Sequence, residues 1–380
     1  MRQGTTICAV DVGTTLIKAT VRRGPDEVLA RSSVRFPNEP DEGEISMHGA
    51  VWRAFASALR QVCVSYVPDT MILSGQMAGL SLIGDDGGPL GPLLPGVQLR
   101  TPQYGALPDL SQSGCADMGT SSVPKFLWCR ENFPRVQTRA LRIGGIKEYL
   151  LYLLTGRWVT DPASASASGF YDMETGTWSA QTLRATNTTE ENFADIAEMD
   201  VVIGEVHSSV ANECGIPPGT AVLCGLGDGP AANMSSGAVG PHRMCFSHGT
   251  TVVARILFAG KVPDLGPMPV FTQHVHRSWK CVGLRFVPDP DSMLFIPTGR
   301  PTERLTLSDI YHYLRPLMDA FDISDVRSVG GRPVALPEFW RTREMTDAQD
   351  GTRGMALVAS GAGLPQQASS ASDQAAEGMR

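Results

Sequence analysis

The sequence predicts an α/β protein built from two related domains. Forty glycines and 27 prolines among 380 residues are typical of short elements joined by tight turns. A strand, a Gly-Thr-Thr turn and a second strand occur twice, at residues 7–21 and 245–254. Because a repeated device indicates a repeated unit, we expect a first domain over residues 1–240 and a second, shorter one over 241–363. Residues 364–380 are rich in Ser, Ala and Gln, which predicts a disordered tail.

The overall composition and net charge of the chain limit the kinds of molecule that it is expected to bind. The formal net charge is -7, which leaves no broad cationic face for nucleic acid. No apolar run reaches the roughly 18 residues that a membrane helix requires. We therefore expect a cytoplasmic protein with neither nucleic acid nor membrane as partner, and leave open whether it forms a homodimer. The eight cysteines lack zinc-site spacing, so we expect buried, reduced thiols.

The first half of the chain begins with a hairpin. Residues 7–12 are a strand-length apolar run, and residues 17–21 predict the returning strand. A buried strand is expected again at residues 71–75, and residues 171–178 are typical of a turn. Helical spacing predicts helices at residues 50–64, 123–131 and 147–154 and around Leu183.

The second half repeats the hairpin after a strand and a small-residue helix. Residues 221–223 predict a strand that ends at Gly225-Leu226-Gly227-Asp228, and residues 231–238 predict the helix. The hairpin follows at residues 245–254. Residues 305–321 then predict the one long helix of this half, with Thr306 or Ser308 as its cap.

A Gly-Thr turn between two strands is a candidate phosphate site. Its backbone N–H groups and hydroxyls form a neutral cradle, and glycine permits close approach. Such turns also close hairpins for purely structural reasons. Two such tips on sister domains could hold one polyphosphate between them.

Five motifs in order resemble those of the FGGY carbohydrate kinases. Residues 11–19 are similar to the first phosphate motif of that family, and residues 74–80 to its sugar-side strand end. The remaining three matches are residues 155–161, residues 225–228 and residues 248–251. The resemblance implies a two-domain actin-like ATPase (ribonuclease H-like) fold with the second domain trimmed. It also implies ATP and Mg²⁺ as cofactors and a small sugar or polyol as substrate.

Roles follow from the resemblance, residue by residue. Asp228 would be the general base, although an aspartate there could instead cap the helix that begins near Pro230. Asp11 would hold Mg²⁺, or serve only as a turn aspartate. The residues implied for the nucleotide are Gly13, Thr14, Thr15, Lys18, Gly249, Thr250, Gly330 and Gly331, with Lys18 alternatively a solvated surface lysine. The residues implied for the sugar are Gln76, Met77, Gln98 and Arg100, with Met77 alternatively a core side chain.

The sequence departs from the family in two places. The usual Trp-x-Asp-x-Arg segment reads Gly96-Val97-Gln98-Leu99-Arg100, so only its arginine remains. Gly330-Gly331 runs directly into Arg332, without the helix that normally follows. Three hypotheses therefore stay open: an active sugar kinase, a fold that has become a binding or regulatory protein, and an enzyme that acts on a sugar-like metabolite without ATP.

Overall fold

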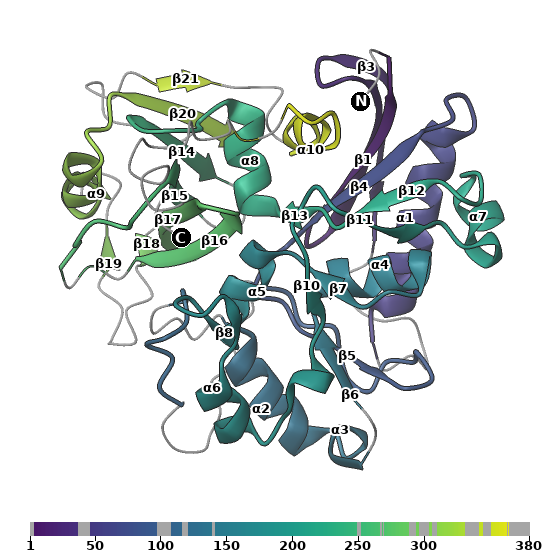
Figure 1. The fold of residues 1–380 in the computed structure, drawn as a ribbon, viewed down its shortest axis with the longest axis horizontal. Coiled ribbons are helices and arrows are strands. Elements are labelled where there is room, and N and C mark those ends of the chain that lie inside the picture. Colours follow the sequence, from purple (N-terminus) through teal and green to yellow (C-terminus); the bar gives the residue numbers. More distant parts are fainter. Residues whose placement is uncertain are drawn as a thin grey trace, which may run out of the picture.

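The architecture has two β-sheets side by side, with helices between and around them (Figure 1). The computed structural model describes residues 4–36, 46–96, 108–115, 121–138, 141–248, 252–266, 268, 270–288, 294–295, 304–305, 310–330, 342–344, 351–362 and 364. Residues 365–380, which include most of the predicted tail, lie outside that set.

The first sheet has the order β11-β12-β4-β1-β2-β3. Its strands are β1 (Thr6–Val12), β2 (Leu16–Arg23), β3 (Glu27–Arg35), β4 (Thr70–Gly75), β11 (Val202–Glu205) and β12 (Ala221–Leu223). β1 pairs antiparallel with β2 and parallel with β4, and β12 runs parallel to β4. The short strand β13 (Leu226–Gly227) pairs with the end of β4. The predicted first hairpin is thus confirmed.

The second sheet repeats this arrangement. Its strands are β14 (Arg243–His248), β15 (Val252–Ala259), β16 (Phe271–His276), β17 (Trp279–Pro288), β18 (Leu294–Phe295), β19 (Arg304–Leu305), β20 (Asp325–Gly330) and β21 (Thr342–Glu344). β14 pairs antiparallel with β15 and parallel with β20, as β1 does with β2 and β4. The central strands of the two sheets therefore follow the same plan, β3-β2-β1-β4-β12 and β17-β15-β14-β20-β21, with the first strand of each hairpin between an antiparallel and a parallel neighbour. The predicted second hairpin is also confirmed.

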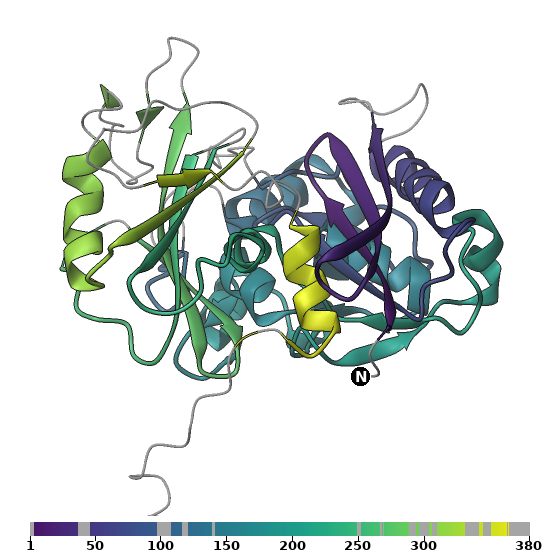
Figure 2. The same cartoon turned by 90° about the horizontal axis from the view of Figure 1, so that it is seen from above.

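Helices cover both faces of the first sheet. One face packs against α1 (His48–Cys63), α4 (Ile146–Thr155) and α7 (Ser208–Cys214). α1 forms here because Val51, Phe55 and Leu59 recur at helical spacing and are fully buried. The other face packs against α8 (Asp228–Ser236) and α10 (Thr352–Ala359), which lie between the two sheets (Figure 2). Because one apolar cluster includes both helices and strands of both sheets, the two halves share a core.

The outer face of the second sheet packs against α9 (Ile310–Ala320). This helix starts at Ile310, so the prediction of a start at residue 305 was wrong. Arg304 and Leu305 instead form β19, because pairing with β18 supplies backbone hydrogen bonds that helical periodicity does not reveal. The predicted caps Thr306 and Ser308 lie outside the described residues.

A smaller unit lies below both sheets in Figure 1. Its apolar cluster includes Leu82, Phe126 and Phe170. Its elements are β5 (Ser81–Gly84), α2 (Ser122–Asn132), α3 (Arg135–Thr138), β6 (Leu141–Gly144), β7 (Val159–Thr160), α5 (Pro162–Ser168), β8 (Tyr171–Asp172), β9 (Thr177–Trp178), α6 (Ala180–Thr186), the 3₁₀ helix η1 (Glu190–Asn192) and β10 (Asp195–Ile196). Residues 171–178, expected as a turn, form the β8–β9 hairpin.

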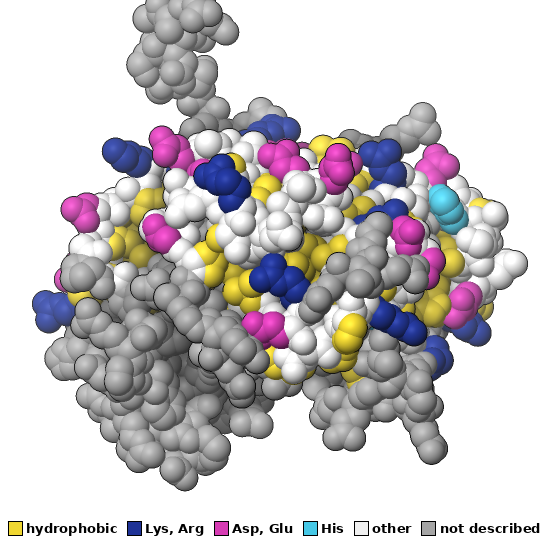
Figure 3. Space-filling model, turned by 90° about the horizontal axis from the view of Figure 1, so that it is seen from below, with side chains coloured by type: hydrophobic (Ala, Val, Ile, Leu, Met, Phe, Trp, Pro, Cys, Tyr) yellow, Lys and Arg dark blue, Asp and Glu magenta, His cyan; other side chains and the backbone are white. Residues whose placement is uncertain are grey.

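The distribution of charged side chains and the burial of the cysteines agree with the expectations from composition. Acidic and basic side chains are interspersed on the face drawn in Figure 3. All eight cysteines are buried and free, as predicted. Within the described part of the chain, no helix combines the length and hydropathy needed to cross a bilayer.

Candidate active site

Three strands of the first sheet end side by side and bring the predicted carboxylates to one edge. Asp11 of β1 lies opposite Ser74 of β4, and Gly227 of β13 lies opposite Gly75. The Ser74 hydroxyl donates a 2.6 Å hydrogen bond to Asp11 Oδ1, which orients that carboxylate. Since Asp228 follows Gly227 directly, Asp11 and Asp228 both project from the carboxyl ends of neighbouring parallel strands. Ligands bind at this edge in open α/β sheets.

The first Gly-Thr turn lies at the same edge. The Gly13 N–H donates to the Leu16 carbonyl at 3.0 Å, which closes the turn between β1 and β2. A Cβ on residue 13 would lie 3.0 Å from that carbonyl, so glycine suits this position. Lys18 lies opposite Asp11 across the hairpin. The remaining residues of the predicted cradle, Thr14 and Thr15, are partly buried.

Glycines allow Asp228 to stand close to the sugar-side strand end. Gly225 has φ +72°, and a Cβ there would lie 2.0 Å from the Leu73 carbonyl. A Cβ on Gly227 would lie 2.2 Å from the Met77 sulfur. A larger residue at position 225 would push the chain away from β4, whereas one at position 227 would have to displace the Met77 side chain.

Asp228 is the first residue of α8, and Gly227 is its N-cap. The helix therefore starts earlier than the sequence predicted, and the capping role considered for Asp228 is wrong. Because β13 ends at Gly227 and α8 begins at Asp228, the strand runs directly into the helix, which fixes the carboxylate at the α8 N-terminus. That position favours a negative charge.

Burial and the neighbouring positive groups act on the pKa of the Asp228 carboxyl in opposite directions. Burial raises its pKa above the ordinary value for an aspartate. The guanidinium groups of Arg255 and Arg285 lower the pKa, as do the backbone amides of Gly229 and Met77, but burial prevails. A carboxylate whose basicity is increased in this way is suited to accept a proton.

Two pockets meet at Met77 and Ala78. The first, which we call the sugar-side pocket, has about 440 Å³ of empty space and is lined by Gln76, Ser122, Glu148 and others. Gln76 Oε1 accepts a 3.2 Å hydrogen bond from the Gly96 N–H, so this side chain also holds the loop after β5. Met77 is 6% exposed and lines both pockets, so burial in the core and a place beside a pocket are compatible for this side chain.

The second pocket, which we call the junction pocket, lies where the two halves meet. Its empty space, counted together with the open solvent at its mouth, is about 360 Å³. Its lining comes from the β4 strand end, α5 and β15 to β17, and consists of Met77, Ala78, Cys115, Ser121, Ala167, Arg255, Phe271, Gln273 and Arg285. Ala78 has φ +58°, an unusual conformation for a residue with a Cβ. Such strain is typical of functional sites.

Basic side chains at the junction pocket were missed by the sequence reasoning. Arg255 is 7% exposed, and its Nη1 donates a 2.7 Å hydrogen bond to the Ser247 hydroxyl. Lys125 donates to the carbonyls of Ala78 and Gly96, at 2.6 and 3.2 Å. Burial, together with Arg285, lowers the pKa of Lys125 to about 7. An arginine inside the apolar strand β15 was the signal that could have indicated Arg255.

The second Gly-Thr turn is described only up to its flanking strands. His248 ends β14 and lies opposite both Val252 and Gly330. The strand ends that lead into the second turn and into the glycine loop are therefore adjacent. The predicted site residues Gly249, Thr250, Gly331, Gln98 and Arg100 lie outside the described residues.

Residues 6–235 match the model of the N-terminal domain of the FGGY family of carbohydrate kinases. The chain belongs to this family. A xylulose kinase of Staphylococcus xylosus is 24% identical over 263 residues, which cover 65% of this FGGY chain and 54% of that relative. An autoinducer-2 kinase of Escherichia coli is 27% identical over 147 residues, which cover 39% of this chain and 28% of the relative. The chain thus spans about half the length of the first relative and about a quarter of the second.

Solved structures confirm the predicted fold class for this FGGY protein. The structure of a gluconate kinase from Lactobacillus acidophilus aligns with a TM-score of 0.77 at 17% identity. The alignment covers 94% of this chain and 89% of that one. The fold is therefore the two-domain, actin-like α/β fold of the sugar kinases.

Proposed function

We propose that this FGGY protein transfers the γ-phosphoryl group of ATP to a hydroxyl of a small sugar or polyol, with Asp228 as general base. One observation carries the proposal: the ends of β1, β4 and β13 bring the glycine-threonine turn, Asp11 and Asp228 to a single sheet edge beside two pockets. Phosphoryl transfer requires this combination of a phosphate cradle and a positioned carboxylate.

The residues at the first turn fit a magnesium nucleotide. The backbone of Gly13 and the hydroxyls of Thr14 and Thr15 would meet phosphate oxygens. Asp11 would hold Mg²⁺, which neutralises charge on the phosphates when bound. In the described part of the chain, no group of three or more His, Cys, Asp or Glu side chains is placed to bind a metal. A single carboxylate fits Mg²⁺, since this ion keeps several waters and binds phosphate oxygens.

The acceptor would bind on the β4 side of Asp228. Gln76 and Met77 border the sugar-side pocket, and Met77 also borders the junction pocket. A hydroxyl placed beside Asp228 would give its proton to that carboxylate as the oxygen attacks phosphorus. Gln98, Arg100 and the second turn with Gly249 and Thr250 would complete acceptor and phosphate binding from outside the described residues. The relatives named xylulose kinase and gluconate kinase suggest ketoses and aldonates as acceptors to test.

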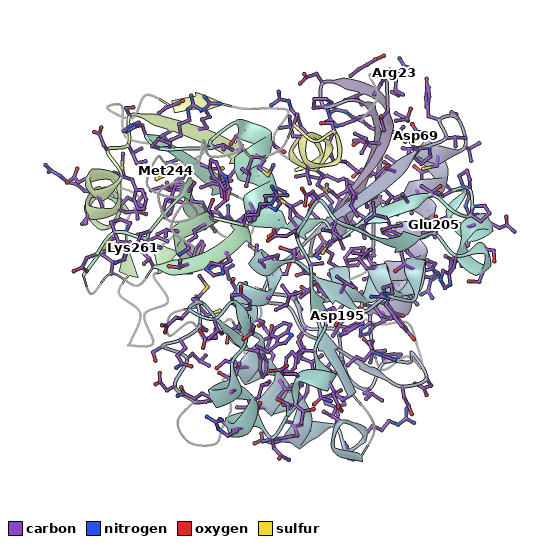
Figure 4. All side chains as sticks on the ribbon, in the orientation of Figure 1. Arg23, Asp69, Asp195, Glu205, Met244 and Lys261 are labelled. Carbon is purple, nitrogen blue, oxygen red and sulfur yellow. The ribbon has the colours of Figure 1, made fainter. Side chains whose placement is uncertain are left out.

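The test is ADP formation with ATP, Mg²⁺ and a panel of ketoses, aldonates and polyols, with phosphorylated product identified by mass spectrometry. We expect Asp228→Asn to lower kcat by about a hundredfold to ten-thousandfold, the contribution typical of a general base. Asp195→Asn is the matched control, because the Asp195 side chain is 80% exposed and belongs to β10 rather than to the strands whose ends carry Asp11 and Asp228 (Figure 4).

The other two hypotheses make different predictions. A binding or regulatory protein would bind sugar or nucleotide in calorimetry without forming ADP under any acceptor. An enzyme of other chemistry would convert a metabolite with ATP omitted. Either result, or full activity in Asp228→Asn, would contradict the kinase assignment.

A further inference from the structure

The junction pocket holds two arginines on one face of the second sheet. In the pairing of β15 with β17, Arg255 lies opposite Gly283 and Val253 lies opposite Arg285. Arg255 and Arg285 are therefore diagonal neighbours, whose side chains project from the same face. This face packs toward the first sheet, because Val253 and Leu257, which alternate with Arg255 along β15, belong to the core between the sheets.

Neither arginine forms an ion pair within the described part of the chain, although the Asp228 carboxylate acts on both electrostatically. Arg255 is anchored through Nη1 to the Ser247 hydroxyl, a neutral partner, and its buried Nε has no hydrogen-bond partner. The buried Nε and Nη1 of Arg285 also lack partners. The described residues show no carboxylate within ion-pair distance of either group. Buried guanidinium N–H groups left in this state are costly, because each loses water without gaining an acceptor.

The charges around the pocket do not balance. Arg255 and Arg285 repel each other, and this repulsion together with burial lowers the pKa of Arg285. Asp228 is the one described carboxylate that acts on both of them. Two guanidinium groups against one carboxylate leave an excess positive charge, which one bound anion would neutralise.

Two further side chains of the lining, Gln273 and Ser121, are polar and suit hydroxyl groups. Gln273 is 5% exposed and Ser121 is 1% exposed, yet Gln273 Oε1 and Ser121 Oγ have no partner in the described part of the chain. Both line the same pocket as the arginines. Buried polar atoms without partners are rare in native proteins, so their concentration in one pocket indicates a missing ligand.

The position of the pocket indicates which ligand supplies the anion. Met77 and Ala78 of the sugar-side strand end line the junction pocket, whereas the phosphate turn at residues 13–15 does not. This placement favours the acceptor over the nucleotide as the source of an anion seated there, although Arg255 is also joined through Ser247 to the strand that leads into the second turn.

We propose that the junction pocket binds a polyhydroxy acid, with its carboxylate between Arg255 and Arg285 and its hydroxyls at Gln273 and Ser121. As a statement about the acceptor, this rests on the proposed kinase function. The anion site itself is independent of phosphoryl transfer and can be tested by binding alone.

The first experiment compares acids with their neutral amides on the wild-type protein. D-Erythronate, D-xylonate and D-gluconate are titrated by calorimetry without ATP, each against the corresponding aldonamide. We expect at least one acid to bind with a Kd at least about tenfold below that of its amide, since hydrogen bonds to charged groups contribute well over a factor of ten. If no acid binds, or if every amide binds as well as its acid, the proposal is wrong.

The second experiment assigns the anion to residues. Arg255→Gln and Arg285→Gln should each raise the Kd of the bound acid at least about tenfold and leave binding of the amide unchanged. Arg315→Gln is the matched control, because this side chain is 62% exposed on α9. Circular dichroism and Tm establish that each variant is folded, and the acid–amide comparison stands without any variant.

A third arm separates the two sources of anionic oxygen. AMP-PNP with Mg²⁺ is titrated into the same variants. If Arg255→Gln and Arg285→Gln weaken AMP-PNP but not the acid, the arginines serve a nucleotide phosphate and the acceptor assignment is wrong. Acid binding without any ATP-dependent product would contradict the kinase function and leave the anion site standing. Phosphorylation of neutral polyols without acid binding would support the kinase function and contradict the anion site.

Discussion

Two of the places that bury cationic side chains differ in how the charge is satisfied. In the first half, Lys147 is 1% exposed and lies 3.1 Å from Asp161 and 3.3 Å from Glu148. At the junction pocket, Arg255 and Arg285 have unpartnered nitrogens and no ion pair among the described residues. A buried charge with its partners in place holds a fold together, whereas one without partners indicates a ligand.

The two Gly-Thr hairpins also differ in the side chains that they carry at corresponding positions. Asp11 is the second-to-last residue of β1, before the first turn. Ser247 holds the corresponding position in β14, before the second turn. In the first hairpin the carboxylate accepts from Ser74, whereas in the second the hydroxyl accepts from Arg255. Equivalent strand positions in the two sister sheets therefore hold a carboxylate in one half and, in the other half, a hydroxyl that accepts from an arginine. The shared fold fixes the positions, and the side chains decide the chemistry.

The largest change in the free energy of unfolding is expected from a substitution of Lys147. Lys147→Met leaves Asp161 and Glu148 buried without their cation, so we expect the free energy of unfolding to fall by about 3–5 kcal/mol. Urea denaturation measures this change. Arg157→Met is the control: its pair with Asp195 is 3.8 Å long and exposed, so stability should change by less than about 0.5 kcal/mol. A loss of less than about 1 kcal/mol in Lys147→Met would show that the buried cluster is not stabilising.

The buried imidazole of His48 can be neutral or charged, so the pH dependence of stability tests how burial acts on a cationic group without a charged partner. His48 is 1% exposed, and its ring nitrogens contact the hydroxyls of Ser46 and Ser81. Burial lowers its pKa from 6.5 to about 4. Between these values the unfolded chain binds a proton that the folded chain does not, so stability is full above pH 6.5 and falls as the pH decreases toward 4, by about 3 kcal/mol.

Denaturation curves of wild type and His48→Gln at several pH values check this sign. The difference in stability between the two proteins should shift in favour of the variant as the pH falls through this range. A difference that does not vary with pH would contradict a neutral buried histidine.

The arginines of the junction pocket should behave in the opposite way from Lys147. Arg255→Met removes one of two repelling charges, so we expect the ligand-free protein to keep its stability or to gain about 1 kcal/mol. Thermal unfolding without ligand measures the effect. A loss of several kcal/mol would show that Arg255 is a structural cation like Lys147, which would weaken the case for a ligand.

The smallest effect is expected at an exposed pair that links the C-terminal helix to the first sheet. Arg353 of α10 donates to Asp26 Oδ1 at 2.9 Å, and the Asp26 side chain is 74% exposed. Asp26→Asn should lower stability by less than about 1 kcal/mol, and the difference should shrink as salt is added. An effect that is large or insensitive to salt would indicate that this contact is better shielded than its exposure implies.

The sequence alone determined the elements and the family of this protein. The strands around Gly13, the helix α1 and the repeated hairpin follow from spacing within a few residues, and local spacing is what a sequence displays directly. The strand β19, read as helix, and the start of α8 at Asp228 were missed, because pairing with β18 and the approach to β4 decided them.

Only the tertiary structure decided which charges meet. Arg255 and Arg285 are neighbours because two antiparallel strands pair in one register, and Asp228 reaches them from the other half of the molecule. Lys147 and Asp161 likewise become partners only when α4 packs against β7 and the N-cap of α5 that follows it. Burial and electrostatic interaction depend on distances through space, so the same side chains carry different roles according to what the fold places beside them.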